Sequence, residues 1–284
     1  MPQTILTLET TAALAESLAA QLEARMGRSV VQLQRPDSDR VWLELYFDRD
    51  VEARLAQRVV EHLPGLVGTA LRGCADRDWQ SFWRHHFHAH DVGKHLRIVP
   101  LWEAKTDRAG KRIRLLLDPG LSFGTGEHFT TRFCLESLDR LCRKPLPASM
   151  LDVGTGSGIL ALAAVKLGVR RVTAYDHDAL ALKHARTNLR RNGVLARVKL
   201  GVHDLLKDPP PGKFDLVCAN VYGRVLMEAA PSLARCVKRH LVLSGLREHE
   251  LDGIADTYQA LGGREVARDG DGQWGGLVMD WENL

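Results

Sequence analysis

A glycine-rich turn between an apolar strand and an apolar helix restricts most strongly what this chain can fold into. The turn spans residues 151–158, with the sequence LDVGTGSG, and a helix-like run over residues 159–167 follows it directly. Gly154 and Gly156 can adopt positive φ and place no Cβ between main chain and ligand, while Gly158 allows close packing of helix and strand. We therefore expect an α/β fold whose turn binds a nucleotide-like cofactor.

The spacing of the glycines distinguishes between cofactors. A dinucleotide fingerprint, GxGxxG, would place its third glycine at position 159, where this chain has Ile159. Asp152 precedes the turn, where a carboxylate would repel a pyrophosphate but can hold a cation or an amine. S-adenosylmethionine carries a sulfonium and an ammonium group and fits this arrangement better than NAD does. The simpler alternative is that the glycines serve turn geometry alone.

An acidic residue follows the next predicted strand, over residues 169–175. Asp176 lies about 20 residues beyond the glycines, where an acidic side chain accepts both hydroxyls of a ribose. Asp178 is predicted to cap a helix that runs to Arg191 and ends at Asn192-Gly193. A second helix cap is the alternative for Asp176, and the glycine turn upstream favours ribose binding.

Composition indicates a soluble protein with ordinary cores. The chain has 284 residues, 45% of them apolar, and a formal net charge of +4, which does not call for nucleic acid. Five scattered cysteines without a CxxC pair argue against a disulfide framework and against a metal site. No apolar stretch approaches membrane-spanning length and no signal sequence is apparent, so we expect a cytoplasmic protein that does not enter membranes.

The first 75 residues predict a small domain. Residues 10–26 have the pattern of an amphipathic helix, residues 41–47 alternate as a strand, and residues 51–63 form a second helix. This alternation predicts an α+β unit of the split β-α-β kind, which is too short for a nucleotide fold.

Residues 76–114 are predicted to connect this unit to a larger one at 115–284. From Arg84 to Arg114 there are eight basic and three acidic residues, which leaves either a solvated face or a phosphate-facing patch open. The histidines of the run 85–90 are adjacent in a loop and diverge, so we expect a solvated or packed cluster and no metal site. The larger unit alternates strand and helix, as a nucleotide-binding sheet does.

A polar loop, FGTGEHFTT at residues 123–131, precedes a predicted helix of that larger unit. The glycines on either side of Thr125 give it hinge freedom. The hydroxyls of Thr130 and Thr131 can cap the helix or reach a ligand carboxylate. Capping explains one of these threonines, but not the pair together with His128.

Asn220 ends a predicted strand at the carboxyl edge of the sheet, where ligands bind in open α/β folds. Enzymes that methylate a planar NH₂ group have two rigid prolines after this position. Val221-Tyr222 stands here instead, so an sp³ amine is the expected acceptor. Such an amine must be neutral to react, and burial near a cation lowers its pKa, so no strong base is required.

Several motifs together are similar to those of the bacterial ribosomal protein L-eleven methyltransferase family. The likeness covers most of residues 76–246, because Asp78-Trp79, Trp83, Phe87-His88 and Pro100-x-Trp102 also resemble the family's interdomain segment. The matching segments are the DPGLSFGTG block at 118–126 with His128 and Thr130-Thr131, DxGxGSGIL at 152–160, Asp176-x-Asp178, Ala219-Asn220 and Leu243-Ser244-Gly245. The DPG to TT block is particular to this family. Glu127, Phe129 and Thr155 depart from the family's usual Thr, Pro and Cys.

The resemblance implies a class I methyltransferase with a Rossmann-like sheet, preceded by a ferredoxin-like domain that holds the substrate protein. Its principal S-adenosylmethionine contacts would be Thr131, Gly154, Asp176 and Asn220. We assign the cofactor site to these and to Phe123, Thr125, Asp152, Gly156 and Gly158. Asn220 would also orient the acceptor amine, and His128 is a candidate proton acceptor.

The expected function is methylation of lysine or N-terminal amines of a ribosomal protein by a monomeric enzyme. Two alternatives stay open. One is a different protein or a small amine as acceptor on the same scaffold. The other is an RNA-associated protein that binds the cofactor without turnover, which only the basic connector favours.

Overall fold

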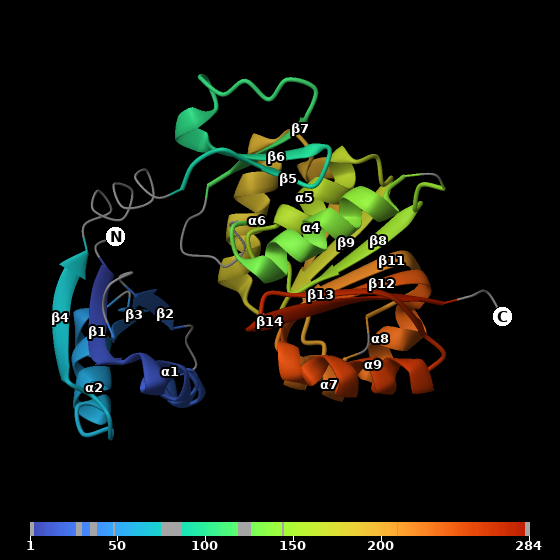
Figure 1. Cartoon of the computed structure of the whole chain (residues 1–284). Helices are drawn as coiled ribbons and strands as arrows, with labels where there is room; N and C mark the ends of the chain where they lie inside the picture. Colours follow the sequence, from blue (N-terminus) through green and yellow to red (C-terminus); the bar gives the residue numbers. More distant parts are fainter. Residues whose placement is uncertain are drawn as a thin grey trace. The chain divides into compact units, whose positions relative to one another are not determined.

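The chain divides into two compact units, Met1–His86 and Phe87–Leu284 (Figure 1). The computed structural model describes residues 3–26, 30–34, 39–47, 49–74, 87–118, 126–143, 145–208 and 210–281. Each unit has a hydrophobic core of its own. Residues 87–114, which the sequence assigned to a connector, fold as part of the second unit.

The first unit is a four-stranded antiparallel sheet with two helices packed against it. Its elements are β1 (Gln3–Thr11), α1 (Ala12–Met26), β2 (Val31–Gln34), β3 (Arg40–Phe47), α2 (Asp50–Val60) and β4 (Gly68–Cys74). Leucines of β1 and β3 alternate toward both helices, because successive strand residues point to opposite faces. The strand order β2-β3-β1-β4 is that of a split β-α-β unit and confirms the predicted ferredoxin-like fold.

The second unit contains a seven-stranded and a three-stranded sheet. Its elements are β5 (His90–Val92), β6 (Leu96–Pro100), η1 (Leu101–Glu103), β7 (Ile113–Leu117), α4 (Phe129–Leu141), β8 (Ser149–Val153), α5 (Ile159–Lys166), β9 (Arg171–Asp176), α6 (Ala179–Arg191), η2 (Leu195–Arg197), β10 (Val198–Val202), β11 (Phe214–Asn220), α7 (Gly223–Glu228), α8 (Ala230–Cys236), β12 (Val237–Arg247), η3 (Glu248–Glu250), α9 (Leu251–Ala260), β13 (Arg264–Gly270) and β14 (Trp274–Asp280).

The large sheet has the order β10-β9-β8-β11-β12-β14-β13, and its first five strands are parallel. Helices α4, α5 and α6 lie on one face and α7, α8 and α9 on the other (Figure 1). This arrangement confirms the predicted Rossmann-like fold. The strand order reverses between β8 and β11, and ligands of open α/β sheets bind outside the carboxyl ends at such a point.

The small sheet, of order β5-β6-β7, packs against α4, α5 and α6 of the large sheet. Asn192 of the α6 C-terminus accepts a hydrogen bond from Leu116 N at 3.0 Å and donates to Leu116 O at 2.7 Å. Asn188 accepts from Asp118 N at 3.1 Å. These bonds satisfy main-chain groups at the end of β7 and fix the segment that leads toward the polar loop.

Candidate active site

The glycine turn adopts the predicted backbone. The φ angles are 69° at Gly154, 54° at Gly156 and 81° at Gly158. Residues that carry a Cβ rarely adopt positive φ. A Cβ on Gly158 would lie 3.0 Å from Ala185 of α6, and one on Gly154 would lie 2.4 Å from Cγ1 of Val221. The glycines therefore allow α6 and the end of β11 to approach the turn closely.

Asp152 of β8 is completely buried under this turn. Its Oδ2 accepts hydrogen bonds from Thr155 Oγ1 at 2.6 Å and from Ala161 N at 3.1 Å, which joins strand, turn and helix. Its Oδ1 is also buried and has no hydrogen-bond partner within the described ranges. Burial raises the pKa of Asp152 to about 7. A cation near Oδ1 would stabilise the charged form.

Asp176 ends β9 and is connected to the turn. Its Oδ2 accepts from Gly156 N at 2.9 Å and its Oδ1 accepts from Asp178 N at 3.0 Å. Each carboxylate oxygen can accept a further hydrogen bond, so ribose hydroxyls are compatible with these contacts. Asp178 caps α6 by accepting from Leu180 N at 2.8 Å, as predicted, so Asp176 is not the N-cap of that helix.

Thr131 and Asn220, 89 residues apart, meet at the same edge of the sheet. Thr131 lies in the first turn of α4 and is buried, and Asn220 is the last residue of β11. Asn220 Nδ2 donates to Thr131 Oγ1 at 3.5 Å. The next residue, Val221, packs against Gly154, and its main chain lies against Gly245, where a Cβ would come within 2.5 Å of Val221 O. The glycine turn, the end of β11 and the start of α4 therefore lie next to one another.

His128 is the N-cap of α4. Its Nδ1 accepts from Thr130 N at 3.4 Å and lies 2.8 Å from Thr130 Oγ1. The two threonines therefore have different positions: Thr130 belongs to the cap, and Thr131 contacts Asn220.

The surroundings of His128 favour its neutral form. Burial lowers its pKa below 6.5, Asp271 opposes this, and the positive charges of Arg247 and Arg132 lower it further. A neutral imidazole at neutral pH can accept a proton. Its ring lies edge-on to Trp274, with centroids 5.2 Å apart.

Sequence reasoning missed three residues near this edge. Trp274 of β14 lies opposite Arg247 of β12, whose guanidinium is 4.0 Å from the indole centroid. His203 follows β10, stacks on Tyr175 and donates its main-chain N–H to Asp176 O at 2.9 Å. A polar residue directly after a parallel strand would have indicated His203. The position of Trp274 depends on the antiparallel strand β14, which the hydrophobic pattern of the sequence did not predict.

Some of the residues singled out in the sequence are not among those that the structure describes. Phe123 and Thr125 are outside the described residues, as are His85 and His86. The described residues contain no group of three or more possible metal ligands, and none of their helices is both long and apolar enough to cross a bilayer. A cavity of about 350 Å³ lies toward the other end of α4, against Lys94 and Arg268, and not at the glycine turn.

The residues at this edge fit a ligand with a ribose and a cationic head. The glycine turn has positive φ at three positions, a carboxylate ends the adjacent strand, and the buried Asp152 has a carboxyl oxygen without a partner in the described part of the chain. With a parallel sheet of this order, these features define a class I methyltransferase, whose methyl donor is S-adenosylmethionine.

Comparison with known proteins gives the particular family. The chain matches the family "Ribosomal protein L11 methyltransferase (PrmA)" over residues 6–281, and it belongs to that family. Curated ribosomal protein L11 methyltransferases of Geobacter sulfurreducens and Chloroflexus aurantiacus are 38% and 34% identical to it. The matches cover 84% of this chain in both cases, and 82% and 81% of those proteins.

A solved structure agrees with this membership. The crystal structure of ribosomal protein L11 methylase from Lactobacillus delbrueckii subsp. bulgaricus is 33% identical, with a TM-score of 0.63. The match covers 69% of this chain and all of that chain. The resemblance that the motifs indicated is thereby confirmed.

Proposed function

We propose that this protein transfers methyl groups from S-adenosylmethionine to lysine or N-terminal amines of ribosomal protein L11. The observation that carries the proposal is the contact between Asn220 and Thr131 beside the glycine turn, at the point where the strand order reverses. Family membership supplies the class of acceptor. The amino group as acceptor follows from the residues after Asn220.

The cofactor contacts follow from the positions of the strand ends. Asp176 would accept the ribose hydroxyls, and the glycine turn would pass close to the ligand without an intervening Cβ. Asp152 would act on the cationic head from beneath the turn, through its charge. Thr131 would contact the same head, and Phe123 and Thr125 would complete the site from the polar loop.

The chemistry requires positioning more than acid–base catalysis. The sulfonium of the cofactor supplies an activated methyl group, which moves to the amine by in-line displacement. The Asn220 amide oxygen would accept a hydrogen bond from the neutral amine and direct its lone pair toward the methyl carbon. The acceptor amine must lose a proton before it reacts, and the neutral His128 is our candidate to receive that proton.

Val221 and Tyr222 support an sp³ amine over a planar amide. They stand where a pair of prolines would hold main-chain carbonyls in fixed directions toward an NH₂ group. Val221 N instead bonds to Ser244 O at 3.2 Å, so this segment is held by the neighbouring strand β12.

The N-terminal unit would recognise the acceptor protein. It has its own core, and the described site residues all lie in the second unit. We propose that the first unit is the recognition domain, that the second unit, from Phe87 onward, is the methyltransferase domain, and that the working form is a monomer in the cytoplasm.

The Asn220→Ala variant tests the proposal. We expect mass spectrometry to show methylated lysine or N-terminal amines when the wild-type protein acts on L11. The variant should lower kcat at saturating cofactor and acceptor, because the lost contact orients the amine in the transition state.

A thermal melt of Asn220→Ala provides the control. If the loss of activity matched the unfolded fraction of the variant, Asn220 would serve the fold alone. If the wild-type protein left L11 unmodified but methylated a small amine, L11 would be the wrong acceptor. The proposed methyl transfer to an amine would still hold.

A further inference from the structure

The segment between η1 and β7 exposes three cations at regular spacing. Residues 104–112, AKTDRAGKR, are called the basic loop below. Lys105, Arg108 and Lys111 are all exposed, and none of them takes part in an ion pair within the part of the chain that the structure describes. They are three residues apart, so neighbouring positions are at most about 10 Å from each other along the chain.

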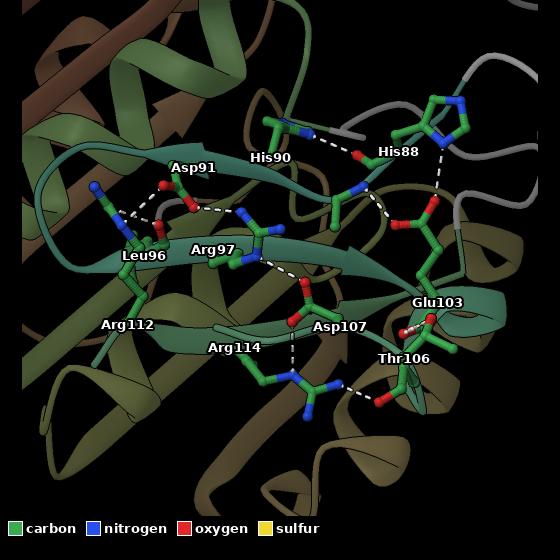
Figure 2. A network of polar contacts seen from close by, with 12 residues as sticks. His88, His90, Asp91, Leu96, Arg97, Glu103, Thr106, Asp107, Arg112 and Arg114 are labelled. Carbon is green, nitrogen blue, oxygen red and sulfur yellow. Dashed lines mark hydrogen bonds and ion pairs between the residues drawn. The ribbon is translucent and has the colours of Figure 1, made fainter. Parts of the chain in front are cut away.

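The carboxylates of residues 87–114 are engaged within the scaffold, as Figure 2 shows. The pairs are Asp107 with Arg97 (2.8 Å) and Arg114 (3.3 Å), Asp91 with Arg97 (2.7 Å) and Arg112 (3.0 Å), and Glu103 with His88 (2.9 Å). The Asp107 side chain is only 1% exposed. Asp91 and Asp107 therefore pair with Arg97, Arg112 and Arg114, and Glu103 pairs with His88. The exposed Lys105, Arg108 and Lys111 have no carboxylate partner among the described residues.

Hydrogen bonds hold the basic loop at both ends. Near its start, Asp107 N donates to Glu103 O at 2.8 Å. At its end, Ile113 N donates to His95 O at 2.7 Å, and Arg112 Nη1 donates to Gly93 O at 3.0 Å. The last contact brings the loop to the β5–β6 turn, which carries the exposed Lys94. The basic loop is thus held at both ends, and its last residue lies beside the turn that carries Lys94. This order reduces the entropy lost when a partner binds.

The composition of the basic loop favours a polyanion over a protein partner. Its only apolar residues are Ala104 and Ala109, whereas protein interfaces have an apolar centre and are depleted in lysine. Nucleic-acid interfaces are more polar and more positively charged. The guanidinium of Arg108 suits a phosphate because its fork binds two oxygens. A Cβ on Gly110 would meet nothing within 4 Å, so the loop is open there.

We propose that the basic loop and Lys94 bind the phosphate backbone of RNA. Binding to phosphates releases counterions, and for single strands the slope of log affinity against log salt is about −0.7 per phosphate contacted. Changing Lys105, Arg108 and Lys111 to Gln should therefore make that slope about 2 smaller in magnitude. At roughly 0.1 M salt, the loss of three contacts weakens binding by about 100-fold.

The experiment is fluorescence anisotropy of the full chain with a labelled single-stranded RNA of mixed sequence, titrated over roughly 50 to 200 mM salt. A matched control changes Lys199, Lys213 and Arg235 to Gln, which removes the same charge from exposed positions away from the basic loop. The wild type and the control variant should bind with similar slopes, and the loop variant should not. Equal losses in both variants would show a general charge effect and overturn the proposal.

A second measurement separates RNA from a protein partner. If the loop variant kept its RNA affinity while KM for the methylated protein rose, the basic loop would contact the protein acceptor and the proposal would be wrong. Cofactor affinity of both variants, measured by calorimetry, should stay unchanged and shows that the methyltransferase fold is intact. If L11 were not the methyl acceptor, the RNA-binding result would still stand, because methylation is measured by mass spectrometry and RNA binding by anisotropy.

Discussion

At the scale of single residues, Asp176 is the most direct test of how the cofactor binds. Its carboxylate already accepts Gly156 N, and hydrogen bonds from ribose hydroxyls to a charged group contribute about 1.5 to 3 kcal/mol. Asp176→Ala should therefore weaken S-adenosylmethionine binding about tenfold or more in calorimetry. Asp178→Asn keeps the cap of α6 and should bind normally. Unchanged affinity in Asp176→Ala, or tighter binding of NAD than of S-adenosylhomocysteine by the wild type, would contradict this role.

Asp152 predicts a dependence of stability on pH. Burial raises the pKa of its carboxyl group from 3.8 in the unfolded chain to about 7. Between these values the folded state binds more protons than the unfolded state, so the free energy of unfolding falls as pH rises. The fall is at most about 4 kcal/mol. Asp152→Asn should lose less stability than the wild type between about pH 5 and pH 8 in urea unfolding without cofactor.

The control for Asp152 is Asp256→Asn, an exposed position on α9. It should follow the wild-type pH dependence. If Asp152→Asn had the same slope as the wild type, its carboxyl group would titrate at an ordinary pKa despite its burial.

Features of single residues could be predicted from the sequence where they depend on near neighbours in the chain. The glycine turn, the cap at Asp178 and the end of β11 at Asn220 each depend on a few neighbouring residues. Arg247 and Trp274 could not be found this way, because β12 and β14 bring them together across the sheet. The Oδ1 atom of Asp152 has no hydrogen-bond partner among the described residues, and this likewise depends on packing from several elements.

At the scale of elements, the parallel strands were predicted because they are buried apolar runs between turn signals. Strand β1 was missed because Ile5 and Leu6 are consecutive, so its pattern does not alternate cleanly. Strand β14 begins with Trp-Gly-Gly, which is typical of a turn. Its glycines are needed because a Cβ on Gly276 would lie 2.3 Å from Phe133. Strand β13 is a charged, exposed edge without a hydrophobic signal.

The small sheet offers a prediction about element stability. Asp107 is buried between Arg97 and Arg114, and removal of one partner of a buried ion pair costs about 3 to 5 kcal/mol when the remaining charge is left uncompensated. Arg97 keeps Asp91 as a partner, so we expect the lower end of this range. Asp107→Ala should destabilise the second unit by about 3 kcal/mol in chemical denaturation. Asp91→Ala removes a half-exposed partner of the same Arg97 and should cost about 1 kcal/mol or less. Equal effects would show that burial of Asp107 does not matter.

At the scale of the whole molecule, the sequence predicted two units but began the second one too late, at residue 115 and not at Phe87. Residues 87–114 have the Trp, His and basic composition of a connector. In the structure they form β5, β6 and η1 and lead into β7, with their charges paired across the small sheet. A charge-rich segment whose opposite charges pair internally cannot be told from a solvated linker by composition alone, because the pairing depends on the register of the strands.

This division predicts what each unit does when separated. A chain that begins near Asp76 keeps every described residue of the proposed cofactor site, because Thr131, Gly154, Asp176 and Asn220 all lie in the second unit. It should bind S-adenosylhomocysteine with nearly full affinity in calorimetry. It should lose most methylation of folded L11, since a transferred group reacts only when its acceptor is held in place. Full activity on L11 would show that recognition resides in the second unit. Loss of cofactor binding in a truncated chain that circular dichroism shows to be folded would mean that the N-terminal unit supports the site itself.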